Sequence, residues 1–172
     1  VEETGAAQYL RDSRIAPIYE GTNGIQAMDL VGRKLGMDGG AHWQRLFADI
    51  HDTVMELKGD RTLSGLAPWL EDALAATRSA TLWLTGANHP DDIAAGATPY
   101  PRMMGLTIGG WLLARQALAV ASHPDPAFAA AKVTTARFFA EQLLPQVTAL
   151  GAGVTRGAAL LYAIPEDGLA AA

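Results

Sequence analysis

PRMMGLTIGGWLLARQALAVAS, the stretch of residues 101–122, is rich in apolar residues and shows no strict alternation of polar and apolar positions. A half-buried strand alternates every second residue, whereas an amphipathic helix repeats its apolar residues every three or four positions. The stretch therefore predicts a helix. The same pattern predicts helices over 42–58, 63–86 and 126–150, with a short one near 155–163.

Two short connectors indicate how these helices are joined. Residues 88–92 and 122–126 both combine proline with side chains that cap helices, such as Asn88, Asp91 and Asp125. Short connections of this kind join antiparallel neighbours in helical bundles. We therefore expect an all-α fold, an antiparallel helical bundle.

The first part of the chain mixes helical patterns with breakers. Residues 2–13 favour a helix that stops before Pro17, and residues 15–24 favour a structured loop. A second helix is expected to follow from Ile25 and to end at the glycines after Leu35. In the first helix the candidates for burial are Ala6, Ala7, Tyr9 and Leu10, and the second has a largely apolar face of Ile25, Met28, Leu30, Val31 and Leu35.

Composition narrows the classes of function. The chain has 172 residues, 49% apolar and 18% charged, which suits a packed globular protein. Its net charge of -5 provides no overall basic field, so we expect no nucleic-acid partner. It has no cysteine, which excludes a disulfide framework and a thiolate zinc site and is compatible with a reducing interior. We expect a cytoplasmic protein.

Metal binding and membrane spanning are not indicated. The four histidines show no HExxH or close paired spacing, so we expect surface or capping histidines and no metal site. No apolar run approaches the roughly 20 residues that a spanning helix needs, so we expect no membrane span. The chain begins with Val1 rather than methionine, and we expect it to be part of a longer protein.

Residues 11–26, RDSRIAPIYEGTNGIQ, strongly resemble the segment around the C-terminal catalytic base of acyl-CoA dehydrogenases. The match runs from about Glu2 to Leu35 and joins the arginine–aspartate pair, the Ile-Tyr-Glu-Gly-Thr core and a later Gly-Arg-Lys-Leu. Few other families share this order. The resemblance implies a flavin enzyme that oxidises acyl-CoA thioesters.

Glu20 is the residue that the resemblance identifies as the general base. A carboxylate that follows Ile18 and Tyr19 and precedes a glycine can lie in a partly apolar cleft, where desolvation raises its pKa toward neutrality. A base that removes the proton α to a thioester carbonyl needs such a pKa. From spacing alone Glu20 would be a solvated loop residue, and the resemblance favours the catalytic role.

The residues that follow Glu20 are expected to contact substrate and cofactor. By the resemblance the acyl thioester lies against Gly21, which otherwise would be an ordinary turn glycine. Thr22, Asn23 and Gly24 correspond to a tripeptide that contacts FAD in similar proteins, and helix capping is the alternative role. Gly24 departs from the longer polar residue of many relatives, so only a backbone contact is expected there.

The resemblance also implies a division of the chain. Residues 1–38 would end the acyl-CoA dehydrogenase C-terminal helical domain, and residues 39–172 would form an appended helical domain. Motifs in the appended part, such as 95–102 and 136–145, resemble the 3-methylmercaptopropionyl-CoA dehydrogenase-like group. The tryptophans are expected to be core anchors or interface residues, and Gly105, Gly109 and Gly110 to permit close helix packing.

Two functions remain open at this point. In the first, the parent enzyme oxidises an acyl-CoA to its 2,3-enoyl form with FAD, passes electrons to an electron-transfer flavoprotein and forms a homo-oligomer. The fragment alone would then be inactive and would not retain FAD, because the flavin-binding parts would precede Val1. In the second, the chain is a non-catalytic oligomerisation or interaction module of an inactive relative.

Overall fold

The computed structural model describes residues 3, 5–18, 22–87 and 89–169. Within these ranges every regular element is an α-helix or a short 3-10 helix, and none is a strand. The all-α prediction is therefore confirmed.

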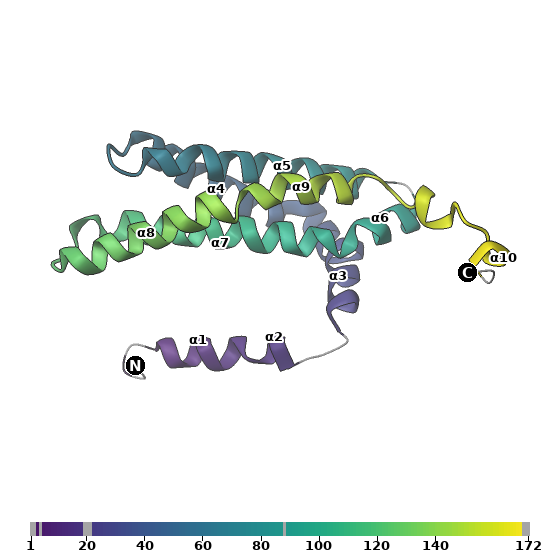
Figure 1. Cartoon of the computed structure of the whole chain (residues 1–172), viewed down its shortest axis with the longest axis horizontal. Coiled ribbons are helices and arrows are strands. Elements are labelled where there is room, and N and C mark those ends of the chain that lie inside the picture. Colours follow the sequence, from purple (N-terminus) through teal and green to yellow (C-terminus); the bar gives the residue numbers. More distant parts are fainter. Residues whose placement is uncertain (1–2, 4, 19–21, 88, 170–172) are drawn as a thin grey trace.

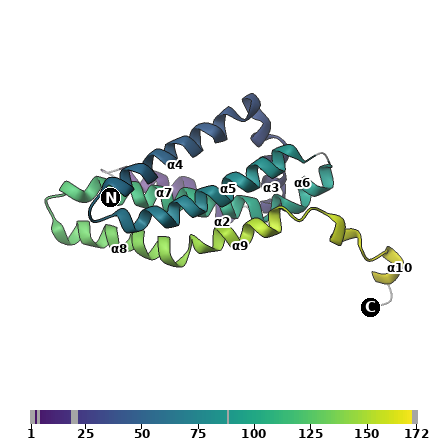
Figure 2. The same cartoon turned by 90° about the horizontal axis from the view of Figure 1, so that it is seen from above.

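Long helices form an antiparallel bundle (Figures 1 and 2). Its members are α4 (Ala41–Gly59), α5 (Ala67–Gly86), α7 (Pro99–Ala119) and the consecutive α8 (Pro126–Gln142) and α9 (Pro145–Val154). The central helix is α7, which packs against α4, α5, α8 and α9. Short 3-10 turns precede α5 at Ser64–Leu66 and follow α7 at Val120–Ser122.

The buried face of α4 shows why this sequence forms a bundle. Phe47, Ile50, Val54 and Leu57 recur every three or four residues, and all four are fully buried. This spacing places them on one stripe of a helix, which must pack against other helices to leave water.

The tryptophans pack at the margin of the core. As expected, Trp43, Trp83 and Trp111 lie partly buried against it, whereas Trp69 is 38% exposed.

The connection between α5 and α7 contains a helix that the sequence pattern did not predict. Residues 88–92 were expected to be a simple connector, but α6 spans Pro90–Ala97. The His89 side chain accepts a hydrogen bond from the backbone N–H of Asp91, so this histidine caps the helix, as expected of the histidines. The other predicted connector holds: Asp125 caps α8 by accepting hydrogen bonds from the N–H groups of Ala127 and Phe128.

The helix predicted over 126–150 is wrong in one respect, because it is two helices. The helix is interrupted at Leu143 and Leu144, and α9 begins at Pro145. Proline has no N–H to donate to the preceding turn, so it favours the first position of a new helix over the interior of a long one. The short helix expected near 155–163 is confined to a 3-10 turn at Ala159–Tyr162.

Close helix packing is confirmed at two of the three glycines of α7. A Cβ atom on Gly110 would lie 2.8 Å from Leu144 Cδ2, and one on Gly109 would lie 3.0 Å from Phe139 Cζ. The neighbouring helices thus approach the α7 backbone closely. A Cβ on Gly105 would meet nothing within 4 Å, so that glycine serves no packing role in this structure.

The N-terminal elements precede the bundle, and the first two of them lie apart from it (Figure 1). They are α1 (Ala6–Ser13), the one-turn α2 (Ile15–Ile18), α3 (Asn23–Gly32) and a 3-10 segment at Lys34–Gly40. Of these, α3 packs against α6 and joins the arm formed by α1 and α2 to the bundle. The prediction of a loop over 15–24 is wrong at α2 and at the first turn of α3, because local helical turns form there.

Expected burial in α1 is also wrong. No residue of α1 is buried, and Tyr9 and Leu10 are 80% and 64% exposed. These side chains have no helix beside them to cover them. Burial is confirmed for Val31 on α3 and for Leu35 in the 3-10 segment after it. Ile25 and Met28 on α3 remain exposed because α6 covers one side of the helix only.

The segment Pro99–Ser122 is long and apolar enough, by length and composition alone, to cross a membrane. It is the one described segment of this kind, and it comprises α7 and the 3-10 turn after it. A core helix of a bundle passes the same test. The segment packs against α4, α5, α8 and α9, and 28% of its most apolar window is buried.

Candidate functional site

The predicted site residues fall at the start of α3. Glu20 and Gly21 lie outside the described residues, so their roles as base and substrate contact stay predictions. Thr22, Asn23 and Gly24 are described: Thr22 precedes the helix, and Asn23 and Gly24 form its first turn. These three consecutive residues lie at the start of α3, and their contact with a cofactor stays a prediction.

The first turn of α3 is open to solvent. The Thr22 carbonyl accepts a hydrogen bond from the N–H of Gln26 at 2.8 Å, which starts the helical ladder. Asn23 and Gly24 are exposed, and a Cβ on Gly24 would meet nothing within 4 Å. The first N–H groups of a helix have no partner within it, and they favour a negative or polar group. This turn therefore has space and donors for such a group.

A groove of about 390 Å³ runs beside this turn, between α3 and the start of α7. Asn23, Gln26 and Lys34 line its α3 side, and Thr98 and Pro101 line the other. The α3 residues lie three to four positions apart with Ala27 and Leu30, so they share one helix face, a periodicity that the sequence alone could have revealed. Nothing in the sequence could have placed Thr98 and Pro101 opposite them, because that pairing depends on how α3 packs.

A charge cluster lies at the end of α3. Arg33 donates to Asp29 from Nε at 2.6 Å and from Nη2 at 2.9 Å, and Lys34 Nζ lies 3.1 Å from the same carboxylate. Hydrogen bonds from Arg33 and Lys34 lower the pKa of Asp29 to about 2. Lys34 also lines the groove, where it contributes a positive charge.

The interior of the bundle holds polar contacts but no charged groups. Thr77 and Thr107 share a hydrogen bond of 2.8 Å between α5 and α7, and Thr81 and Tyr100 share one of 2.7 Å between the same helices. Burial raises the pKa of Tyr100 to about 12. Among the described residues no Asp, Glu, His, Lys or Arg is buried. In the described core, threonine and tyrosine hydroxyls therefore join α5 to α7 by hydrogen bonds, and they form no acid–base pair for catalysis.

Histidines and acids of the described ranges form no group of three or more that could hold a metal ion. The residues that fit a ligand are instead those of the α3 turn and its groove. Asn23 supplies an amide, Gly24 leaves open space, and Lys34 supplies a nearby cation. These groups suit the polar or anionic part of a cofactor.

The fold and this site define a helical bundle with an open polar turn at the edge of its N-terminal arm. Residues 46–165 match the family described as acetyl-CoA dehydrogenase C-terminal like. The chain belongs to this family. The matched residues begin within α4 and extend through the rest of the bundle.

Three relatives support the same family assignment. The chain is 40% identical over 162 residues to a 3-methylmercaptopropionyl-CoA dehydrogenase of Ruegeria pomeroyi, covering 90% of this chain and 28% of that protein. It is 33% identical over 156 residues to the broad-specificity linear acyl-CoA dehydrogenase FadE5 of Mycobacterium tuberculosis, covering 82% and 26%. It is 31% identical over 157 residues to a butyryl-CoA dehydrogenase of Syntrophomonas wolfei, covering 86% and 26%.

The chain therefore spans about a quarter of the length of the curated relatives that it matches, between 26% and 28%. The similarity to the first of them bears out the resemblance to the 3-methylmercaptopropionyl-CoA dehydrogenase-like group. The names of these relatives describe dehydrogenases that act on acyl-CoA thioesters.

Proposed function

We propose that this chain is the C-terminal part of an FAD-dependent acyl-CoA dehydrogenase, which oxidises an acyl-CoA thioester to the 2,3-enoyl-CoA. The proposal rests on one observation: the chain contains both a family match and a separate sequence motif. Residues 46–165 belong to the acetyl-CoA dehydrogenase C-terminal like family, and Tyr19-Glu20-Gly21-Thr22 stands directly before α3. The alternative, a non-catalytic interaction module, is consistent with the family match but does not explain the presence of residues 19–22.

Glu20 acts as the general base in this proposal. Its carboxylate takes the proton from the carbon α to the thioester carbonyl, and the electrons of that C–H bond form the new carbon–carbon double bond. When bound, FAD supplies the acceptor for the hydride that leaves the β carbon. The described core holds no buried carboxylate or histidine that could serve instead.

Thr22, Asn23 and Gly24 bind and orient a polar part of the cofactor. The N–H groups of the first turn of α3 and the Asn23 amide donate hydrogen bonds, and the open space at Gly24 lets that group approach the backbone. Lys34 in the adjacent groove contributes positive charge. Gly21, which has no side chain, lets the acyl thioester approach the backbone closely.

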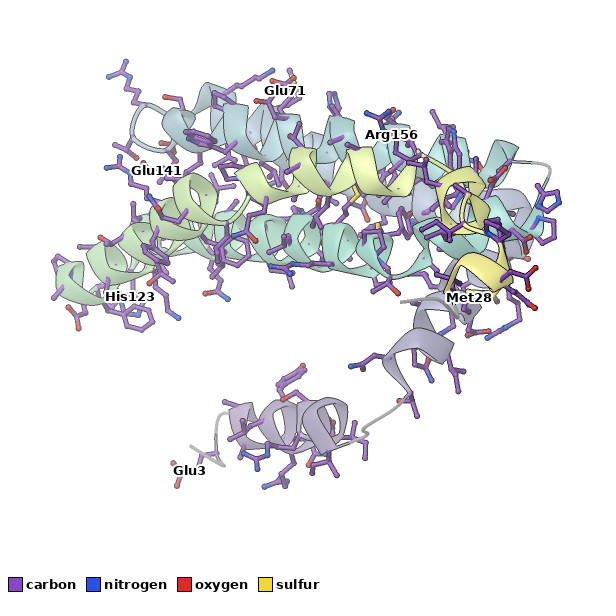
Figure 3. All side chains as sticks on the ribbon, turned by 45° about the vertical axis from the view of Figure 1, so that its right-hand side comes forward. Glu3, Met28, Glu71, His123, Glu141 and Arg156 are labelled. Atoms are coloured by element: carbon purple, nitrogen blue, oxygen red, sulfur yellow. The ribbon has the colours of Figure 1, made fainter. Side chains whose placement is uncertain are left out.

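The N-terminal arm completes a larger site by docking. Tyr9, Leu10, Ile15 and Ile18 are all more than half exposed, and Figure 3 shows the side chains of this arm apart from those of the bundle. Exposed apolar surface of this kind marks an interaction site. We place the further acyl-CoA dehydrogenase domains of the parent against it, with residues 1–38 ending their helical domain and residues 39–172 forming the appended one. The full enzyme is then a homo-oligomer that passes electrons to an electron-transfer flavoprotein.

Replacing Glu20 in the full-length parent tests the chemistry. Glu20→Gln keeps the size of the side chain but cannot accept a proton, so flavin reduction by acyl-CoA should slow by about 10²–10⁴-fold. Glu20→Asp is the matched control, which keeps the base and should retain part of the rate. Anaerobic stopped-flow absorbance measures reduction, and the flavin spectrum before mixing reports cofactor content. Reduction by Glu20→Gln at the wild-type rate would remove Glu20 from this role.

A further inference from the structure

The predicted cofactor turn, residues 22–24, is attached to the bundle mainly through α6. The helix that carries this turn, α3, packs more extensively against α6 than against α7. Figure 1 shows α3 below α6, at the end of the bundle where α9 also ends. Thr98, on the far wall of the groove, directly follows Ala97, the last residue of α6. Both walls of the groove are thus connected to α6.

Two contacts fix α6 to the end of α9. Asp92 accepts a hydrogen bond from the N–H of Ala158 at 2.8 Å. A Cβ on Gly96 would lie 2.7 Å from the carbonyl oxygen of Val154, so the two backbones approach closely there. Asp92 and Gly96 are four residues apart and therefore lie on the same face of the helix. That face of α6 is held at two points, one turn apart.

The backbone around Ala158 is shaped for the contact with Asp92. Gly157 has φ +69, a conformation that favours glycine, and a Cβ there would lie 2.6 Å from Asp92 Oδ1. Ala158 is buried, whereas the described chain beyond it, a 3-10 turn at Ala159–Tyr162 and α10 (Glu166–Leu169), is exposed. The hydrogen bond to Asp92 therefore marks the point at which the end of the chain is fastened to the bundle.

Helix α6 depends on such contacts because it is short. It spans eight residues, fewer than the roughly 12–15 at which an isolated helix becomes even marginally stable in water. The His89 cap stabilises only its first turn. Its position against the bundle must come from tertiary contacts. A hydrogen bond accepted by a carboxylate is among the stronger contacts of this kind.

We propose that Asp92 is a positioning residue for the predicted cofactor turn. By holding Ala158 it fixes α6 to the end of α9, and α6 in turn fixes α3 relative to the far wall of the groove. Asp92 itself touches neither substrate nor cofactor. The link from α3 to FAD rests on the proposed function, whereas the link from Asp92 to α3 does not.

Hydrogen exchange in the 172-residue chain tests the link to α3 without a cofactor. Asp92→Ala removes the acceptor, so the amides of α3 should exchange about tenfold faster while those of α5 and α7 keep their rates. Gly157→Ala disturbs the same contact from the other side and should give the same pattern. Asp92→Asn keeps an oxygen that can accept the hydrogen bond, and it should restore most of the protection.

Asp91→Ala is the matched control for these variants. It removes the neighbouring carboxylate from the first turn of α6, and the Ala158 N–H is bonded to Asp92 instead. The exchange of α3 should therefore stay at the wild-type rate in Asp91→Ala.

Titration of the full-length parent with FAD tests the link to the cofactor turn. Asp92→Ala should raise the Kd for FAD by about tenfold, and Asp92→Asn should bring it back toward the wild-type value. A variant with a purely structural effect separates stability from positioning. Thr77→Val removes the buried hydroxyl shared with Thr107, so it should lower the thermal midpoint and leave the Kd for FAD unchanged.

The proposal is overturned if α3 in Asp92→Ala exchanges at the wild-type rate, or if its faster exchange is shared equally by α5 and α7. It is also overturned if Asp92→Ala binds FAD as tightly as the wild type, or if Thr77→Val weakens FAD binding equally. A wild-type parent that binds no FAD would overturn the proposed function and, with it, the link to the cofactor. The exchange rates of α3 would still decide whether Asp92 positions that helix.

Discussion

The N-terminal arm and the bundle differ in burial and in their relation to the predicted chemistry. The segment in which chemistry is predicted, residues 20–24, directly follows the arm in the sequence, and no residue of α1 in the arm is buried. The bundle carries the family match and a continuous core, yet its described interior has no charged side chain. Residues for chemistry and residues for stability are thus separated along the chain.

This difference teaches how each region depends on its surroundings. The bundle buries enough apolar surface within one chain to hold its helices together. The arm consists of helices shorter than the 12–15 residues at which an isolated helix becomes even marginally stable in water, so it needs an outside surface to keep its geometry. Docking to a larger assembly would supply that surface.

The largest expected effect comes from matched alanine substitutions in the two regions. Phe47→Ala removes a fully buried ring from the bundle and should reduce the free energy of unfolding by about 3–5 kcal/mol. Leu10→Ala removes a side chain that is 64% exposed, and it should change that free energy by less than about 0.5 kcal/mol. Urea unfolding followed by circular dichroism measures both. Equal losses would mean that the arm belongs to the cooperative core.

Two glycines of the bundle allow a comparison between a tightly packed position and an open one. A Cβ on Gly96 of α6 would lie 2.7 Å from the carbonyl oxygen of Val154, a backbone atom that cannot rotate away. Gly96→Ala should therefore destabilise the fold by about 1–3 kcal/mol. Gly105→Ala enters open space and should stabilise α7 by up to about 1 kcal/mol. Thermal unfolding of both variants checks the signs, and two stabilised proteins would show that α6 is free to move off α9.

Tyr100→Phe tests the polar contacts of the core. It removes the hydroxyl bonded to Thr81, whose own hydroxyl still donates to the Thr77 carbonyl, and should cost about 1 kcal/mol at neutral pH. The pKa of Tyr100 is about 12 when folded and about 10 when unfolded, so the unfolded state loses its proton first as pH rises. Its contribution is present below pH 10 and is lost toward pH 12, at no more than about 1.4 kcal/mol per pH unit.

Unfolding by urea at pH 9 and pH 11 measures this loss. The wild-type chain should lose more stability than the Tyr100→Phe chain over that interval. Identical losses in the two proteins would contradict the burial of the Tyr100 hydroxyl.

The smallest effect is expected at α3, where arm and bundle meet. Hydrogen bonds from Arg33 and Lys34 lower the pKa of Asp29 from 3.8 to about 2, so its contribution is present above pH 4 and is lost as pH falls toward 2. The carboxylate is solvated, and such pairs contribute little. Asp29→Asn should lower the thermal midpoint slightly at pH 6, with the difference vanishing near pH 2. A constant difference across this range would exclude the ion pairs as its cause.

Much of the helical architecture was predictable from local signals. The helices over 42–58, 63–86 and 101–122 match α4, α5 and α7 closely, because apolar spacing and breakers act within a few residues. Two predictions were wrong for local reasons: Pro145 begins a second helix within the range 126–150, and Pro90 begins α6 where a loop was predicted. In both places proline marked the first turn of a helix.

The site was predictable in part. The resemblance of residues 11–26 to a known family implied a base, a substrate contact and a cofactor turn. The structure describes Thr22, Asn23 and Gly24 at the start of α3, and the roles of these residues stay predictions. The groove beside that turn, with Thr98 and Pro101 opposite Asn23, could not be derived, because those residues are separated by more than seventy positions and meet only through packing.

The sequence by itself determined that this protein is helical, where most of its helices lie, and which family it belongs to. These properties depend on residues close together in the chain, whose periodicity and order act before any tertiary contact forms. Tertiary structure alone decided which faces are covered. It buried Val31 but not Met28 of α3, left Tyr9 and Leu160 exposed, and placed Arg78 and Leu82 in the lining of one hollow. Burial depends on which helix lies alongside, and that is a property of the packed chain rather than of any segment.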